Sequence, residues 1–365
     1  MTRFCLAAAL TGAVCLYAQA PANLVSPEVQ PGGRATLRIR APKAAEVTLT
    51  ADWIAPGTTE KLTKDDNGVW SVTVGPLDPG IYIYSFTVDG TPMADPVNPR
   101  IKLRARTSAS LLEIPADPPA VWQARDVPHG AVQINWEKAK AIAGETRSMW
   151  IYTPPGYEKG TQRYPVLYLL HGSNDTQAGW TMVGGANFIL DNLIADKQAV
   201  PMIVVMPFGH ALPFGAGRGP RSNDQVFEEY LLGDAMPLVE AKYRVAPGRG
   251  NRAIAGLSMG GGQSLAIGFN HLDLFSAIGA FSAAVPADFE TRYASALAHP
   301  AETNAKLKLL WFGCGKQDSL FGRSQKLADL FEAHQIRHTF RAIDGFHTYV
   351  VWRKFLAEMA PLLFQ

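Results

Sequence analysis

The stretch Gly256-Leu257-Ser258-Met259-Gly260 decides the fold of this chain. An apolar run that is typical of a β-strand precedes it, and a segment compatible with a helix follows it. A serine at such a strand–turn–helix junction, with a glycine two positions away on either side, is typical of a nucleophile elbow. The small neighbours permit the strained backbone that presents the hydroxyl at the mouth of a sheet. The pattern predicts that Ser258 is a catalytic nucleophile.

An aspartate and a histidine follow Ser258 in the order that an α/β-hydrolase requires. A buried-strand pattern at residues 307–312 leads into a loop with Asp318, which is where the acid of a catalytic triad belongs. Another strand pattern, at residues 337–343, is followed by His347 and then by a final helical pattern. The order predicts a triad in which the carboxylate orients the imidazole and the imidazole takes the serine proton.

Alternatives exist for the acid and for the histidine. Asp318 is also explained as a helix cap or a turn residue, and Asp344 lies only three residues before His347. We expect Asp344 to close a turn instead. The remaining histidines of this region flank a helix end, a strand start and a polar insertion, and they fit the order less well: His299, His334 and His338.

Two backbone N–H groups are expected to form the oxyanion hole. One belongs to Met259, the residue after the nucleophile, and the other to the loop that follows the third strand of the sheet. That strand is predicted at residues 165–170 and ends in His171-Gly172-Ser173. Gly172 lets the backbone turn so that the amide of Ser173 faces the site. We expect His171 to support this loop rather than to act in catalysis.

The segment from residue 130 to the end resembles the esterase D superfamily, and within it carbohydrate esterase family 1, which contains bacterial feruloyl and acetylxylan esterases. The matching stretches follow the family's order through most of this segment: YPVLYLLHG, the later Trp180, VVMPFG, FEEYLLGDAMPLVEAKYRV, GLSMGG, GCGKQD and GFHTYVVWRKFL. The resemblance implies the same triad and the same two oxyanion amides. Trp352 and Arg353 match a family pattern, and we expect them to anchor the last helix beneath the site.

The resemblance also implies two-step acyl transfer from an ester to water, with no metal or organic cofactor. Feruloyl groups on a plant polysaccharide such as arabinoxylan are the first expectation for the substrate, and acetylated xylan is the alternative. Trp180 and Phe208 are either walls of an aromatic acyl pocket or ordinary core residues. Residues 209–226 and 286–305 are expected to form the lid and the acyl pocket.

The composition is that of a globular enzyme with two domains. The chain has 365 residues, and its net charge of +2 follows from 34 basic and 32 acidic residues. This balance, without a basic stripe, argues against a nucleic-acid partner. No segment is long and apolar enough to span a membrane stably, and no obligate protein partner is indicated.

The first twenty residues are typical of a cleaved export signal and predict a secreted or periplasmic protein. Arg3 supplies the positive start, an apolar core follows, and residues 18–20 fit the small-x-small cleavage site. Cys15 leaves a lipoprotein as the alternative. After cleavage Cys314 is the one remaining cysteine, so no internal disulfide is expected.

Residues 21–105 are predicted to form a small immunoglobulin-like β-sandwich, because short alternating runs are separated by turns rich in Asp, Asn, Gly and Pro. The stretch DDNGVWSVTVGPLDPGIYIYSFTVDG, followed by DPVNP, resembles the family 48 carbohydrate-binding modules. Trp70, Tyr82 and Tyr84 form either a sugar-stacking face or core and interdomain packing. The resemblance implies a module that docks on the catalytic domain and shapes its substrate entrance.

These patterns divide the chain into a signal peptide at 1–20, a β-sandwich at 21–105, a linker at 106–129 and an α/β-hydrolase domain with a doubly wound, mostly parallel sheet at 130–365. Three other functions remain open. A siderophore esterase of the enterochelin type would also place a β-domain before a related hydrolase domain. A non-catalytic carbohydrate-binding protein would carry the fold without the reaction. An acyltransferase would pass the acyl group to a sugar instead of water.

Overall fold

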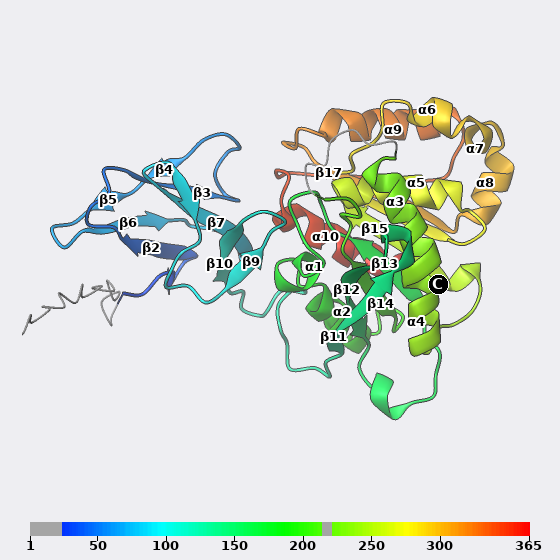
Figure 1. The fold of residues 1–365 in the computed structure, drawn as a ribbon, viewed down its shortest axis with the longest axis horizontal. Helices are drawn as coiled ribbons and strands as arrows, with labels where there is room; N and C mark the ends of the chain where they lie inside the picture. Colours follow the sequence, from blue (N-terminus) through cyan, green and yellow to red (C-terminus); the bar gives the residue numbers. More distant parts are fainter. Residues whose placement is uncertain (1–23, 214–220) are drawn as a thin grey trace, which may run out of the picture.

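The computed structural model describes residues 24–213 and 221–365, and it contains two domains side by side (Figure 1). A β-sandwich, which we call the front domain, precedes an α/β-hydrolase domain, as the sequence predicted. The expected export signal at residues 1–20 lies outside the described residues. Within the described ranges no helix combines the length and the apolar character needed to cross a bilayer.

Two antiparallel sheets pack face to face in the front domain. One sheet has the strand order β1-β2-β6-β5, and the other has the order β4-β3-β7-β10-β9, with β8 paired to β7. The strands are β1 (Glu28–Gln30), β2 (Arg34–Arg40), β3 (Val47–Ala51), β4 (Glu60–Lys61), β5 (Thr63–Lys64), β6 (Val69–Val74), β7 (Gly80–Val88), β8 (Thr91–Met93), β9 (Ile101–Leu103) and β10 (Ser108–Ile114).

Strand β10 corrects one prediction. The linker expected at residues 106–129 is wrong in its first part, because Ser108–Ile114 pairs with both β7 and β9. Five of its seven residues are buried, on both faces of the sheet, so the sequence lacks the alternation of polar and apolar positions that indicates a strand. The front domain therefore extends to Ile114, and residues 115–129 contain no helix or strand.

The nine-residue strand β7 divides its side chains between two apolar clusters. Tyr82, Tyr84 and Phe86 lie in the core of the sandwich, whereas Ile81 and Ile83 pack with the hydrolase domain. Successive residues of a strand point to opposite faces, so this one sheet is a wall of both cores. The aromatic residues considered for a sugar-stacking face are all buried in the sandwich.

A mixed sheet forms the centre of the hydrolase domain, with the strand order β11-β12-β14-β13-β15-β16-β17-β18. β11 and β12 are antiparallel to their neighbours, and the strands beyond them are parallel to one another. The strands are β11 (Ala131–Ala139), β12 (Glu145–Thr153), β13 (Val166–Leu170), β14 (Ile203–Pro207), β15 (Arg252–Leu257), β16 (Ala277–Phe281), β17 (Leu309–Gly315) and β18 (Thr339–Ile343).

Helices cover both faces of this sheet (Figure 1). Helices α3, α4, α5 and α9 contribute to a large apolar cluster on one face. Helices α1, α2 and α10 form a second cluster, which the front domain joins. The helices are α1 (Gly179–Met182), α2 (Ala186–Ala195), α3 (Asn223–Tyr230), α4 (Met236–Lys242), α5 (Met259–Asn270), α6 (Phe289–Arg292), α7 (Ala294–Ala298), α8 (Pro300–Lys306), α9 (Phe321–Ala333) and α10 (Tyr349–Met359).

An apolar interface joins the front domain to helix α10. Ile83 and Leu111 of the front domain lie in the same cluster as Val351 and Phe355 of this helix. Helix α10 begins two residues after His347. The contact with the front domain is therefore directly connected, along the chain, to the predicted catalytic histidine.

Arg353 adds polar contacts to this interface. It is 1% exposed, and its guanidinium donates to the carbonyl oxygens of Tyr349 on its own helix and Ile81 on the front domain. Burial lowers the pKa of the guanidinium to about 10, while the nearby carboxylate of Asp52 opposes this effect. Arg353 thus ties the last helix to the front domain, which extends the anchoring role expected from the sequence.

We predict that Leu111→Ala lowers the free energy of unfolding by about 2–5 kcal/mol, because it leaves a cavity between the two domains. Leu111 is 2% exposed, whereas Leu103 on the neighbouring strand is 51% exposed. Leu103→Ala is therefore the matched control, with an expected change below about 0.5 kcal/mol. Urea-induced unfolding followed by fluorescence provides the measurement. Similar values for both variants would contradict a packed interface.

Candidate active site

Ser258 lies at the sharp turn between β15 and α5. Its backbone has φ 54° and ψ −116°, a conformation that residues other than glycine rarely adopt. The Ser258 amide donates to the Phe281 carbonyl at 2.8 Å, and the Ser258 carbonyl accepts from the Ala284 amide at 2.9 Å. These two hydrogen bonds to the end of β16 and the loop beyond it hold the serine in its strained conformation.

Two glycines make this turn possible because both lie against other backbone atoms. A Cβ atom on Gly256 would lie 2.5 Å from the carbonyl carbon of Gly260, and one on Gly260 would lie 2.6 Å from the His171 carbonyl oxygen. Either side chain would push helix α5 away from the end of β13. The glycines of the motif therefore set the distance between Ser258 and the predicted oxyanion loop.

Asp318 and His347 meet beyond the ends of β17 and β18. His347 Nδ1 lies 2.7 Å from Asp318 Oδ2, and the other carboxylate oxygen accepts the Leu320 amide at 2.8 Å. Burial by itself raises the pKa of the Asp318 carboxyl, but these hydrogen bonds favour the charged form, and the pKa lies below its usual value. The charged carboxylate orients the imidazole and leaves Nε2 on the far side of the ring.

The alternative acid, Asp344, lies elsewhere. Its side chain is 79% exposed, and it forms an ion pair with Lys316 at 3.3 Å. Asp318 is therefore the carboxylate that contacts His347. The Trp352 ring packs against the imidazole nearly at a right angle, with 4.8 Å between the centroids.

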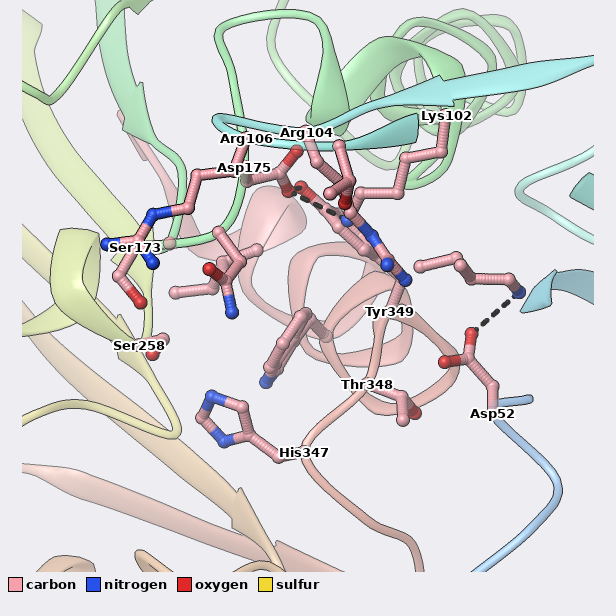
Figure 2. A pocket seen from close by; sticks show the side chains of 16 residues that line it. Asp52, Lys102, Arg104, Arg106, Ser173, Asp175, Ser258, His347, Thr348 and Tyr349 are labelled. Atoms are coloured by element: carbon pink, nitrogen blue, oxygen red, sulfur yellow. Dashed lines mark hydrogen bonds and ion pairs between the residues drawn. The ribbon is translucent and has the colours of Figure 1, made fainter. Parts of the chain in front are cut away.

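Ser258 and His347 line one cavity of about 400 Å³, which lies where the two domains meet (Figure 2). We call it the histidine-side cavity. The hydrolase domain contributes the serine, the histidine, the oxyanion loop and the start of α10. The front domain contributes the remaining wall, made of Asp52, Ile83, Lys102, Arg104, Arg106 and Thr107.

The predicted oxyanion donors lie on two sides of Ser258. Met259 is the first residue of helix α5, so its N–H group has no acceptor within the helix. Ser173 follows Gly172, where a Cβ atom would lie 2.7 Å from Leu257 Cδ1. Neither amide donates to an acceptor among the described residues. Two unsatisfied N–H groups beside a strained serine are what an oxyanion requires.

His171 clamps this loop in the way that the sequence suggested. Its Nδ1 lies 2.8 Å from the Gly172 carbonyl oxygen, and its Nε2 accepts the Gly209 amide at 2.9 Å. The second bond requires an unprotonated Nε2, so the proton of the neutral ring is on Nδ1. Burial lowers the pKa of this imidazole to about 4. His171 is therefore a neutral bridge between the loops after β13 and β14.

A buried polar network joins the oxyanion loop to the front domain. Asp175 Oδ2 accepts the Tyr349 hydroxyl at 2.5 Å and lies 3.4 Å from the ammonium of Lys102 on β9 (Figure 2). The Lys102 ammonium also lies 4.9 Å from the centre of the Tyr349 ring. In addition, the Ala105 amide donates to the Asn174 carbonyl at 3.4 Å. The front domain thus contacts the same loop that carries Ser173.

A second cavity, of about 920 Å³, adjoins Ser258 on the Met259 side. We call it the methionine-side cavity. Its apolar lining includes Val285, Pro286 and Tyr293, which lie in the loop after β16 and in the helical insertion that follows this loop. Residues from both segments expected to form the acyl pocket, 209–226 and 286–305, line this cavity. The described residues thus place a separate cavity on either side of Ser258.

Trp180 and Phe208 do not line either cavity. Trp180 is 1% exposed, donates from its indole nitrogen to the Leu170 carbonyl at 2.9 Å and packs edge-on against Tyr349. Phe208 stacks on His171 with 5.5 Å between the ring centroids. Of the two alternatives for Trp180, a pocket wall or a core residue, the structure shows the core residue, which donates to the end of β13. Phe208 supports the His171 clamp.

The resemblance implied that the front domain shapes the substrate entrance, but the sequence analysis did not identify the residues that line the site. Lys102, Arg104 and Arg106 alternate in the stretch IKLRART, and they all line the histidine-side cavity. Basic residues at alternate positions could have indicated one charged face of a strand. The stretch, however, lay at the boundary of the expected linker. Among the described residues no group of His, Cys, Asp or Glu could hold a metal ion.

The fold and this arrangement define the class of the protein, an α/β-hydrolase of the esterase type. The chain belongs to the family whose model is described as "Putative esterase", which matches residues 140–363. A curated relative from Xylanibacter ruminicola, named endo-1,4-beta-xylanase/feruloyl esterase, is 32% identical over 93% of this chain and 46% of its own length. The chain spans about half the length of the curated relatives it matches first.

Solved structures agree with this class. A ferulic acid esterase is 28% identical, with a TM-score of 0.57 over 64% of this chain and 98% of its own. The enterobactin esterase of Shigella flexneri is 18% identical, with a TM-score of 0.66 over 91% of this chain and 94% of its own. The second similarity shows the fold alone, and its coverage extends to the front domain. The resemblance to feruloyl esterases predicted from the motifs is confirmed.

We predict that His171 makes stability depend on pH. Because its pKa falls from 6.5 to about 4 on folding, its contribution is complete above pH 6.5 and is lost as the pH falls toward 4. In this window the unfolded chain takes up a proton that the folded one does not, at a cost of about 3 kcal/mol. His171→Gln removes the titration, so its free energy of unfolding should fall less over the same window. Equal pH dependence in urea titrations of both proteins would contradict this.

We predict that Lys102→Met destabilises the protein by about 3–5 kcal/mol, because it leaves the buried carboxylate of Asp175 without its cation. The double variant Lys102→Met/Asp175→Asn should recover part of this loss, since the neutral amide needs no counter-charge. The coupling from a double-mutant cycle is expected at about 0.5–3 kcal/mol. Additive effects in urea unfolding would show that the two side chains do not interact.

Proposed function

We propose that the protein is an exported serine carboxylesterase that removes feruloyl groups from a plant cell-wall polysaccharide such as arabinoxylan. The observation that carries the proposal is the hydrogen bond between His347 and Asp318 at a cavity that also contains Ser258. A nucleophile, a base and an orienting acid that meet in this way suit acyl transfer. The export component rests on the signal-like pattern of residues 1–20.

In the proposed mechanism His347 takes the proton of Ser258 as the serine oxygen attacks the ester carbonyl carbon. Asp318 holds the imidazole in the required tautomer and stabilises its charged form. The amides of Ser173 and Met259 donate to the oxyanion, and each such donor is worth about 3 kcal/mol in comparable sites. The alcohol leaves with the proton from His347, and water then releases the acid from the acyl-enzyme.

The two cavities divide the substrate between them. The leaving oxygen must lie within hydrogen-bond reach of the imidazole that protonates it, and His347 lines the histidine-side cavity but not the methionine-side cavity. The alcohol half of the ester therefore occupies the histidine-side cavity. The acyl half occupies the methionine-side cavity, beside Met259, Val285 and Tyr293.

The acyl half is proposed to be feruloyl because its cavity is large and partly apolar. Its volume of about 920 Å³ exceeds what an acetyl group needs, and Tyr293 and Pro286 offer surfaces for an aromatic ring. The name of the Xylanibacter ruminicola relative, which includes feruloyl esterase, supports the same acyl group. Acetylated xylan remains the alternative substrate of the same site.

A second candidate function is hydrolysis of a catecholate siderophore lactone. The observation that favours it is the enterobactin esterase of Shigella flexneri, which matches this chain over both domains. The same serine mechanism would serve this ester. Parallel measurements of kcat/KM on methyl ferulate, acetylated xylan and a catecholate trilactone separate the three substrates, and the ferulate ester is expected to be turned over.

We predict that Ser258→Ala lowers kcat/KM on methyl ferulate by at least about 10³-fold, because it removes the attacking oxygen. Ser295→Ala, on the exposed surface of α7, is the matched control and should keep the unmodified rate. Release of ferulate is followed by its absorbance. Turnover by the Ser258 variant at the rate of the control would overturn the proposed nucleophile.

A further inference from the structure

The hairpin between β9 and β10 carries two arginines into the histidine-side cavity. Its turn is closed by the hydrogen bond from the Arg104 amide to the Thr107 carbonyl, 3.1 Å long. The turn is fixed against the hydrolase domain by the contact between Ala105 and Asn174. Figure 2 shows Arg104 reaching down into the cavity and Arg106 reaching toward Ser173. The hairpin is therefore a fixed part of the site.

The charges of this cavity do not cancel. Lys102 is paired with Asp175, but Arg104 forms no salt bridge or side-chain hydrogen bond with any of the described residues. Asp52 is the other acid of the lining. Burial raises the pKa of its carboxyl, and one of its oxygens already accepts the Ile83 amide at 2.9 Å. A bound anion would offset the excess of positive charge.

The position of these arginines indicates which half of the ester carries the anion. This step rests on the proposed function, in which the alcohol half occupies the cavity that contains His347. Arg104 and Arg106 line that cavity and not the methionine-side cavity. The anionic group therefore belongs to the leaving saccharide and not to the acyl group.

We propose that Arg104 provides a carboxylate-binding subsite, and that the preferred substrate is an ester of a saccharide that carries a uronic acid. A carboxylate is the anionic group that uronic acids supply, and the planar guanidinium fork binds it through two parallel hydrogen bonds. The half-buried position of Arg104 strengthens such a bond relative to one in open water. The front domain thereby selects the sugar, and the hydrolase domain performs the reaction.

The test uses two substrates that differ in one group. One is a feruloylated xylo-oligosaccharide with a glucuronic acid branch, and the other is the same compound after reduction of the uronic carboxyl to an alcohol. For the full chain, kcat/KM should be about 10-fold higher or more on the acidic compound. Arg104→Gln should remove this preference. Arg40→Gln, which removes one exposed cation elsewhere on the front domain, should retain it.

A second measurement needs no variant. Salt screens exposed charges, so the preference of the unmodified protein for the acidic compound should shrink as the ionic strength rises. Equal kcat/KM on both oligosaccharides, with methyl ferulate turned over, would overturn the subsite and leave the proposed function intact. Failure on all three ferulate esters would overturn both. Loss of catecholate-trilactone turnover alone in the Arg104 variant would assign this arginine to an anionic siderophore and overturn the uronate subsite.

Discussion

The close crossing of β15, α5 and the end of β13 is the constraint on which the rest of the structure depends. Gly256 and Gly260 touch backbone atoms that a side chain would displace, and the strained Ser258 lies between them. A strained backbone conformation persists when the contacts around it stabilise it by more than the strain costs. Here the fixing elements are the end of β16, through Phe281, and the His171 clamp of the neighbouring loop. The serine is thus held by packed elements and not by a flexible loop.

The front domain also packs against the elements that hold the site. Its sheet has two buried faces, one toward its own core and one toward α10. At this interface Arg353 and the Lys102–Asp175 pair are buried, and burying a charge is costly unless it is paired or hydrogen-bonded. The Lys102–Asp175 ion pair and the hydrogen bond from Arg353 to the Ile81 carbonyl form only when the domains are docked. Since Asp175 belongs to the loop that carries Ser173, docking and the geometry of the oxyanion loop depend on each other.

The sequence predicted those features that local backbone chemistry imposes. The elbow at Ser258, the loops of Asp318 and His347 and the supporting role of His171 followed from motifs whose glycines and chain order have direct steric reasons. It did not predict β10, because a strand buried on both faces lacks alternation. It also left the role of Trp180 open, since an indole that supports β13 and one that lines a pocket give the same pattern. Burial against another domain depends on contacts between residues far apart in the sequence. The local alternation of polar and apolar residues therefore does not reveal it.

In the proposed function, two unrelated folds recognise the two halves of one ester. The methionine-side cavity is lined by the hydrolase domain, whereas the histidine-side cavity has one wall from each domain. The acyl group and the alcohol therefore encounter different sets of side chains. Substitutions in the hairpin between β9 and β10 can alter the choice of alcohol without touching Val285 or Tyr293. The catalytic groups lie at the junction, where Ser258 and Ser173 border both cavities. Selection of the two halves is thus separable in space although the reaction joins them at one carbon.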